Sequence, residues 1–267
     1  MMNRPLVPDP EVIFLEKLLS RLNKNVIFDF DDAIYLNENH DHKIGGIIKI
    51  SKITIAGNDY LASFAKRYTA NIAIIPTVVD TNIYKIRRSK TSNKITTIGW
   101  SGFHDGLDTM IDFMKPILEK LFLSKKFRFI LITNDPPSSI PISVDYSIYE
   151  WEKDTEIEVL NNIDIGIMPL KDSHFNRGKC GFKLIQYGGI GIPSVASDVG
   201  FNNKVIDNEK TGFLVGNERE WIDCLSKLID DSNLRKKMGE DAYEKVSNAY
   251  SIDNTLPKLI KLFDTII

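Results

Sequence analysis

Three carboxylates follow an apolar run near the start of the sequence, and their spacing suits chemistry. Residues 25–35 read NVIFDFDDAIY, so Asp29, Asp31 and Asp32 lie within four positions. Such a run predicts a buried strand, and polar groups at the carboxyl end of a parallel strand face a cleft. The acids could hold a metal ion, act as the nucleophile pair of a phosphatase, or serve another purpose.

The phosphatase option rests on a resemblance to the haloacid-dehalogenase-type enzymes, in which an apolar strand ends in Asp-x-Asp, as Asp29 and Asp31 do here. Thr133 and Lys183 would fill two further positions of that pattern. The late acidic strand of that family supplies Mg²⁺ ligands, but here the first of them would be Asn217. A metal-binding Asp-x-Asp motif, known from single-domain transferases that hold a diphosphate, is a further alternative.

A second stretch combines glycines with positive charge. Residues 178–200 read GKCGFKLIQYGGIGIPSVASDVG. A glycine-bearing loop that enters a helix directs free backbone N–H groups and the helix dipole at one place, where Lys179 and Lys183 add cations. The pattern predicts a diphosphate cradle, and Gln186, one turn beyond Lys183, could bind a sugar hydroxyl. The alternative is an ordinary loop, helix and strand with solvated lysines.

This second stretch resembles the group 1 glycosyltransferases, a large retaining family with the two-domain GT-B fold. Further segments are similar to that family's motifs in the same order: IPTVVD at residues 75–80, IGWSG at 98–102, IDIGIMP at 163–169 and TGFLV at 211–215. The resemblance therefore covers nearly the whole chain. It implies transfer of a sugar from a nucleotide-diphosphate-sugar donor, without a metal or cofactor.

The resemblance also assigns roles at the donor diphosphate. Ser101 and Gly102 would offer backbone N–H groups to it, Lys183 would pair with its charge, and Lys179 is a second candidate.

The rest of the donor site departs in part from the family pattern. Gln186 takes the place of the glutamate that holds the ribose, and Trp151, just past a predicted strand, would flank the base. Gly178 takes the place of the glutamate that contacts the transferred sugar. Asp31 and Asp32 replace a histidine and an acid that face the cleft in the family; with Asp29 they are the catalytic candidates.

The fold expected is α/β and GT-B-like, with two doubly wound parallel-sheet Rossmann-like domains. We place a partial acceptor-side domain at residues 1–88, a nucleotide-sugar-binding domain at 89–250, and a C-terminal helix at 251–267 that packs back on the first domain. The basic segment at 85–93 is interpreted as the linker. A single helix, opening at Asp9-Pro10, precedes the first strand, so the N-terminal domain is expected to be truncated. Two explanations stay open: the chain is a fragment, or a second polypeptide completes the domain.

Composition limits the partners. Lys and Arg total 34 against 36 Asp and Glu, and the net charge of −2 argues against a nucleic-acid partner. Two distant cysteines predict a reducing, cytoplasmic setting. No apolar run is long enough to span a membrane, which leaves peripheral contact with the inner face of the cell membrane. The segment His40-Asp41-His42 is interpreted as a solvated loop and not as a metal site.

The function predicted is transfer of a sugar to a hydroxyl of a saccharide or lipid-linked acceptor. The resemblance to the family implies a role in surface polysaccharide synthesis. Two alternatives stay open: a truncated, inactive nucleotide-sugar-binding protein, and a Mg²⁺-dependent phosphatase.

Overall fold

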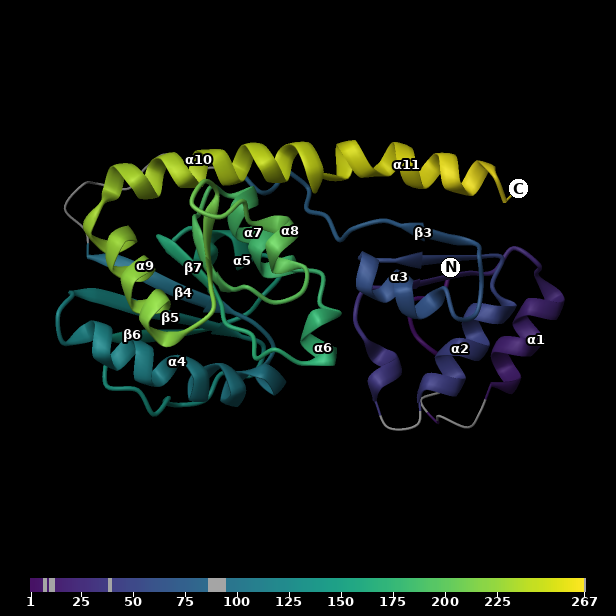
Figure 1. The fold of residues 1–267 in the computed structure, drawn as a ribbon, viewed down its shortest axis with the longest axis horizontal. Coiled ribbons are helices and arrows are strands. Elements are labelled where there is room, and N and C mark those ends of the chain that lie inside the picture. The colour runs from purple at the N-terminus through teal and green to yellow at the C-terminus, as the bar shows by residue number, and fades with distance from the viewer. Residues whose placement is uncertain (7–8, 10–12, 38–39, 86–94, 267) are drawn as a thin grey trace.

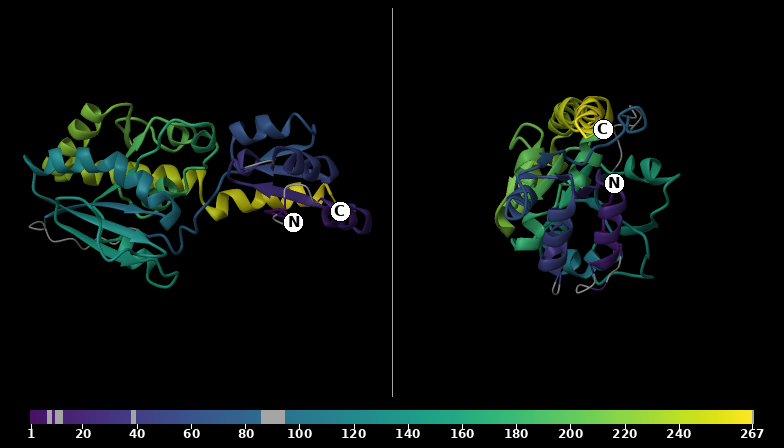
Figure 2. Two further views of the ribbon diagram at one scale, coloured as in Figure 1. Left: turned by 90° about the horizontal axis from the view of Figure 1, so that it is seen from below. Right: turned by 90° about the vertical axis from the view of Figure 1, so that its right-hand side faces the viewer.

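The computed structural model describes residues 1–267 except 7–8, 10–12, 38–39, 86–94 and 267. The chain forms two lobes, and a C-terminal pair of helices extends along both of them (Figure 1). Figure 2 shows the same two lobes from below and from one end. The predicted boundary between residues 88 and 89 and most of the predicted linker lie outside the described residues.

The first domain has a small parallel sheet whose strands lie in the order β1-β2-β3. Its elements are α1 (Phe14–Leu22), β1 (Ile27–Phe30), η1 (Ile34–Leu36), α2 (His40–Ile50), β2 (Ile53–Ala56), α3 (Asp59–Ala65) and β3 (Ile72–Ile74). Phe30 pairs with Ala56, so β1 and β2 end together. The loops that follow these strands therefore leave the sheet at the same edge.

The prediction of a solvated loop at His40-Asp41-His42 is wrong, because these residues form the first turn of α2. The helix was missed because Gly45 and Gly46 lower helix propensity. Tertiary packing explains both glycines: a Cβ at Gly45 would lie 2.4 Å from the Tyr68 ring, and one at Gly46 would lie 2.4 Å from Cδ1 of Ile13. Close approach of neighbouring side chains requires glycine there.

The second domain has a six-stranded parallel sheet in the order β6-β5-β4-β7-β8-β9. Its strands are β4 (Thr96–Ser101), β5 (Phe127–Thr133), β6 (Tyr146–Glu150), β7 (Ile165–Met168), β8 (Ser194–Ser197) and β9 (Gly212–Val215). β4, β5, β7 and β8 are almost wholly buried, as expected for parallel strands covered on both faces. The apolar runs thus predicted these strands correctly.

Helices cover both faces of this sheet and form two separate cores. The helices that follow β4 in the chain are η2 (His104–Gly106), α4 (Leu107–Phe122), α5 (Glu156–Leu160), α6 (His174–Arg177), α7 (Phe182–Gly189), α8 (Asn202–Val205), α9 (Glu218–Asp230), α10 (Ser232–Ala249) and α11 (Ile252–Asp264), the last of which packs on the first domain. In the sequence, Asn217 and Glu220 have the spacing that predicts a capping box. The structure confirms it at the start of α9, because Glu220 N–H donates to Asn217 Oδ1 at 3.0 Å.

The chain crosses between the domains twice, and the two crossings are bonded to each other. The N–H of Val79 donates to the carbonyl of Tyr250, and the N–H of Ile252 donates to the carbonyl of Val79. Beyond this point α11 packs on the first domain, where Ile266 shares a small core with Ile27 and Ile55. None of the described helices is long and apolar enough to cross a membrane.

Candidate functional site

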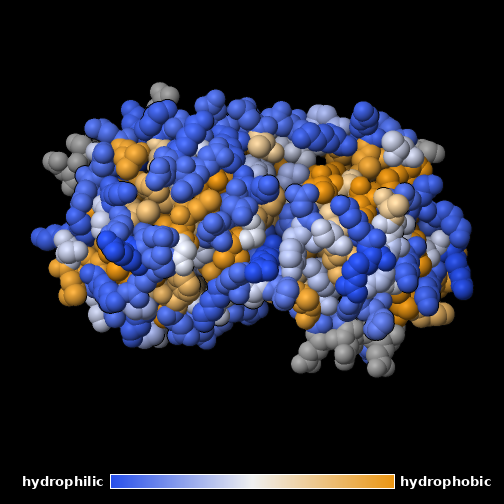
Figure 3. Space-filling model, in the orientation of Figure 1, coloured by the Kyte–Doolittle hydropathy of each residue, from blue (hydrophilic) through white to orange (hydrophobic). Residues whose placement is uncertain are grey.

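The carboxyl ends of both sheets face the boundary between the domains, which is where ligands of open parallel sheets bind. In Figure 3 hydrophilic side chains lie along this boundary. β1 and β2 supply the loops at Asp31 and at Asn58 from one side. From the other side come the loop after β4 at Gly102 and the segment before α7.

Asn58 joins the two domains. Its Oδ1 caps α3 by accepting the N–H of Leu61 at 2.9 Å. Its Nδ2 donates across the boundary to the carbonyl of Gly178 at 2.9 Å, to that of Lys179 at 3.3 Å and to Sγ of Cys180 at 3.2 Å. One buried amide therefore fixes the start of a helix and also holds the loop of the opposite domain.

The loop at residues 178–180 packs tightly on the first domain. A Cβ at Gly178 would lie 2.7 Å from Cβ of Ala33, so no larger side chain fits there without movement. Cys180 is 5% exposed and belongs to the core of the first domain. Burial and the charge of Asp31 raise the pKa of its thiol to about 12, so the thiol stays protonated. At Gly178, where the resemblance expects a glutamate, Ala33 therefore leaves no room for a side chain.

Charges from both domains converge beside this loop, in a group that we call the boundary cluster: Asp31, Asp32, Lys179 and Lys183. Burial raises the pKa of Asp32, and the positive charges of Lys179 and Lys183 act against that rise. Burial and the charge of Lys179 lower the pKa of Lys183 to about 8, while Asp32 acts to raise it. Two predicted donor-site cations and two predicted catalytic acids are therefore brought together.

The side chain of Lys183 is held by packing. Its Nζ lies 5.2 Å from the centre of the Trp100 ring, a cation–π contact. A Cβ at Gly102 would lie 2.4 Å from Cζ2 of Trp100 and 2.9 Å from Cε of Lys183. Gly102 thus leaves room for both side chains at the end of β4.

The structure corrects the role predicted for the backbone at Ser101 and Gly102. The N–H of Ser101 donates to the buried hydroxyl of Tyr187 at 3.0 Å, and the N–H of Gly102 donates to the carbonyl of Ile132 at 3.0 Å. Neither group is free for a diphosphate, because the fold uses one for helix packing and the other for the ladder between β4 and β5.

The three acids of the first domain are not equivalent. Asp32 is half-buried and the charges of both lysines act on its pKa, whereas Asp31 is exposed. Asp29 lies on the same face of β1 as Ile27, which packs on the side of α11. Burial and the charge of Asp31 raise the pKa of Asp29 to about 6. The alternation of the strand therefore directs Asp29 away from the side on which Phe28 and Phe30 pack.

A second group, which we call the Glu156 network, contains Tyr84, Trp151, Glu156 and Gln186. Glu156 Oε1 accepts Trp151 Nε1 at 2.7 Å and Gln186 Nε2 at 2.8 Å. Glu156 Oε2 accepts the Tyr84 hydroxyl at 2.8 Å, and Gln186 Nε2 also donates to that hydroxyl at 3.0 Å. Three neutral donors thus hold one carboxylate between the two residues predicted to bind the nucleoside.

Sequence reasoning missed Glu156, because an acid in the first turn of a helix has an ordinary explanation in the helix dipole. The sequence did contain one signal. Gln186 stands where the resemblance expects a glutamate, so α7 lacks a carboxylate at this position. The fold supplies a carboxylate at the same place from α5.

Among the described residues, no group of three or more His, Cys, Asp or Glu side chains is arranged to hold a metal ion. Asp29 and Asp31, the pair on which the phosphatase alternative depends, lie at the end of β1 and just beyond it.

Comparison with known proteins gives a consistent result. The sequence model of the family described as "Glycosyl transferases group 1" matches residues 92–231, more than half of the chain. The capsular polysaccharide biosynthesis glycosyltransferase CapM of Staphylococcus aureus is 23% identical over 265 residues, which are 94% of this chain and 66% of CapM. The chain thus spans just under two thirds of the length of this relative.

Solved structures share the fold. Sucrose-phosphate synthase of Thermosynechococcus elongatus superposes with a TM-score of 0.76 at 11% identity, over 94% of this chain and 71% of that one. HepE of Anabaena, in its complex with UDP-glucose, superposes with a TM-score of 0.74 at 11% identity, over 96% of this chain and 77% of that one. These structures are GT-B glycosyltransferases, so the predicted two-domain fold is confirmed.

Proposed function

The chain belongs to the group 1 glycosyltransferases, and from this premise we propose that it transfers a sugar from a nucleotide-diphosphate-sugar donor to a hydroxyl of a saccharide or lipid-linked acceptor. The single observation that carries the proposal is the boundary cluster. Lys179 lowers the pKa of Lys183, so the two ammonium groups repel each other in the free protein. A diphosphate between them would relieve that repulsion.

The Glu156 network and the boundary cluster would bind different parts of the donor. The Glu156 network would hold the ribose and, through Trp151, the base. Lys183 and Lys179 would hold the diphosphate and stabilise the charge that develops on it as the sugar leaves. By family implication the transfer retains the anomeric configuration and needs no metal ion.

The acids of the first domain would act on the sugar side. The charges of both lysines act on Asp32, so we assign it to the hydroxyls of the transferred sugar, and the exposed Asp31 to orientation of the acceptor. The pKa of Asp29, about 6, suits a group that exchanges protons near neutral pH. The variant Asp31→Asn should lower the rate of transfer and leave nucleotide affinity unchanged.

The primary test is calorimetric titration with UDP, GDP and ADP, with and without Mg²⁺, supported by thermal unfolding. One nucleoside diphosphate should bind without Mg²⁺ and, at 100 times its Kd, stabilise the fold by about 2.7 kcal/mol. Absence of binding by all three would contradict the proposal. Release of phosphate that depends on Mg²⁺ and is lost in Asp29→Asn would instead favour the phosphatase.

A second candidate, a nucleotide-sugar-binding protein without catalysis, is favoured by one observation. Ala33 leaves no room at Gly178 for the glutamate that the resemblance expects there. Binding of a nucleotide sugar without its hydrolysis or transfer would support this candidate.

The other expectations about partners stay predictions. They are a cytoplasmic location, peripheral contact with the inner face of the membrane, a second polypeptide beside the first domain, and a place in surface polysaccharide synthesis.

A further inference from the structure

Helix α1 presents its large apolar side chains to solvent and its one carboxylate to the interior. Glu16 is the only fully buried residue of this helix. Phe14 and Leu22 are 66% and 79% exposed, and Leu15 and Leu18 are exposed as well. In a helix that only packs on a core, the apolar side chains form the buried face. The reversed arrangement in α1 therefore has a cause other than packing of the first domain.

Contacts within the first domain fix the orientation of α1. Oε1 of Glu16 accepts the N–H of Leu6 at 3.0 Å, and no part of the Glu16 side chain reaches solvent. Leu19 and Ile13 pack against the core of this domain. The opposite face of α1 is therefore held outward by the fold and meets solvent in the free protein.

The exposed apolar side chains of α1 form one stripe. Phe14, Leu18 and Leu22 follow each other at intervals of four residues, which stacks them along one side of a helix. Leu15 lies three residues before Leu18, so its side chain borders the stripe. Single exposed leucines are common on protein surfaces, but this stripe places four large apolar side chains on a helix of nine residues. Contiguous patches of this kind mark surfaces that bind a partner.

Cations border this stripe. Lys17 and Arg21 lie one turn apart on α1, Lys24 follows its end, and all three are exposed. The one acid between residues 13 and 28 is the buried Glu16, so no exposed acid lies among these cations. Within the part of the chain that the structure describes, no ion pair involves any of the three. The outward face of α1 is therefore partly apolar and partly positive, without a negative charge.

Helix α11 shows that exposed apolar residues alone do not give this pattern. Leu256 and Ile260 are exposed on α11, but Asp253 and Asp264 of the same helix are exposed too. A face of mixed charge does not attract an anionic surface. The two helices thus differ in charge more than in exposed apolar residues, and the charge of α1 favours an anionic partner.

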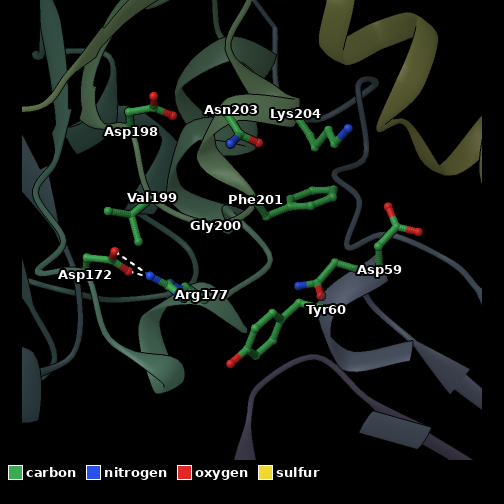
Figure 4. Close-up of a pocket in the computed structure, with 11 residues that line it drawn as sticks. Asp59, Tyr60, Asp172, Arg177, Asp198, Val199, Gly200, Phe201, Asn203 and Lys204 are labelled. Atoms are coloured by element: carbon green, nitrogen blue, oxygen red, sulfur yellow. Dashed lines mark hydrogen bonds and ion pairs between the residues drawn. The ribbon is translucent and has the colours of Figure 1, made fainter. Parts of the chain in front are cut away.

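The position of α1 suits contact with an extended surface. In Figures 1 and 2, α1 lies at the end of the first domain that points away from the second domain. Figure 4 shows the pocket between the domains, which is lined by Asn58, Asp59 and Tyr60 and by side chains that follow β7 and β8. Helix α1 contributes no side chain to this pocket. A surface that binds α1 is therefore separate from the cleft between the domains.

We propose that α1 docks the protein on a membrane surface that contains anionic phospholipid. The four exposed apolar side chains enter the region between the lipid headgroups and the acyl chains, and the cations beside them contact lipid phosphates. Lysine is depleted in the cores of protein–protein interfaces, so the cations beside the stripe favour lipid over a protein partner. Since α1 belongs to neither the boundary cluster nor the Glu156 network, this docking is independent of nucleotide binding.

The charge of α1 is tested by co-sedimentation of the full chain with vesicles. Vesicles of phosphatidylcholine alone are compared with vesicles of equal parts phosphatidylcholine and phosphatidylglycerol. The wild type should bind the anionic vesicles, and added NaCl should weaken this binding by screening. Lys17→Gln/Arg21→Gln should bind about 30-fold more weakly, from about fivefold for each cation. The matched control, Lys126→Gln/Lys236→Gln, removes two exposed cations of the second domain and should bind as the wild type does.

The apolar stripe is tested by a separate substitution. Leu22→Ser should weaken binding to the anionic vesicles about tenfold, because one leucine side chain no longer enters the acyl region. Leu123→Ser is the control, since Leu123 is 89% exposed on the second domain. Both leucines are exposed, so neither variant should change thermal unfolding or nucleotide affinity.

Three results would overturn the proposal: equal binding of the wild type to both kinds of vesicle, binding to neither, or binding to the anionic vesicles that Lys17→Gln/Arg21→Gln and Leu22→Ser leave unchanged. Analytical ultracentrifugation without vesicles provides a further check. A dimer that Leu22→Ser dissociates would assign this face of α1 to a second copy of the chain instead.

Discussion

The Glu156 network and the boundary cluster lie at the same edge of the second domain but are held in different ways. The network is closed by four hydrogen bonds of 2.7 to 3.0 Å, and three of its members belong to the second domain. In the boundary cluster, among the residues that the structure describes, no ion pair joins Asp32 to Lys179 or Lys183. These groups act on each other by charge across the domain boundary.

This difference means that the Glu156 network is preorganised, whereas the boundary cluster forms only where the two domains meet. A hydrogen-bonded network held mostly within one domain keeps its shape in the free protein, so little entropy is lost when a ligand binds. A cluster built from two domains depends on the contact between them, which Asn58 maintains here. The nucleoside end should therefore be the rigid part of the site, and the diphosphate and sugar end the part that responds to domain closure.

Removal of the charge of Lys183 should have the largest effect. Lys183→Met should lower affinity for the preferred nucleoside diphosphate about 100-fold, or ~3 kcal/mol, because the diphosphate loses a partly buried charge partner. Calorimetric titration measures this, with Lys126→Met, an exposed lysine, as the matched control. Burial lowers the pKa of Lys183, so the variant should not be less stable than the wild type. Unchanged affinity would show that the boundary cluster does not bind the diphosphate.

The domain contact can be broken separately. Asn58→Ala should lower the free energy of unfolding by about 2–3 kcal/mol, because it removes a helix cap and leaves buried carbonyls without donors. Asn58→Asp keeps the cap but loses the donors. Urea unfolding compares both with Asn217→Ala, an exposed cap, for which a loss of about 1 kcal/mol is expected. Equal losses at Asn58 and Asn217 would mean that the cross-domain bonds contribute nothing.

The Glu156 network should show a smaller and more selective effect. Glu156→Gln should lower nucleoside diphosphate affinity about tenfold, because a charged acceptor near the ribose becomes a neutral one. The wild type should discriminate against the 2′-deoxy nucleotide, and the variant should do so less. Glu158→Gln on the same helix is the control. If Glu156→Gln discriminates as well as the wild type, the network does not contact the ribose.

The smallest effect is a pH dependence confined to the boundary cluster. The pKa of Lys183 is lowered to about 8, so its charge is present below this pH and lost above it. Nucleotide affinity should fall about twofold by pH 8 and about tenfold by pH 9, since each unit above the pKa costs tenfold in the protonated form. Lys183→Arg should remove this dependence, because arginine stays charged. A fall that persists in that variant would assign the titration to another group.

Much of this architecture could be predicted from local patterns. The apolar runs at residues 53–56, 127–133 and 212–215 predict strands, and β2, β5 and β9 are found at these positions. The Asn217–Glu220 pair likewise predicts the start of α9. The approach of Lys183 to Lys179 also followed from their spacing at a helix start. These features depend on neighbours in the chain, which a sequence displays directly.

Other features depended on contacts between distant segments. The sequence determined that a carboxylate is missing at Gln186, but only the tertiary structure placed Glu156 beside it, 30 residues away in the chain. The sequence likewise predicted a strand over residues 94–100 with Ser101 and Gly102 directly after it, yet only packing decided that their N–H groups bond to Tyr187 and Ile132. Hydrogen bonds between distant segments form when helices and strands pack, and the choice of partner depends on the positions of all the neighbouring elements at once.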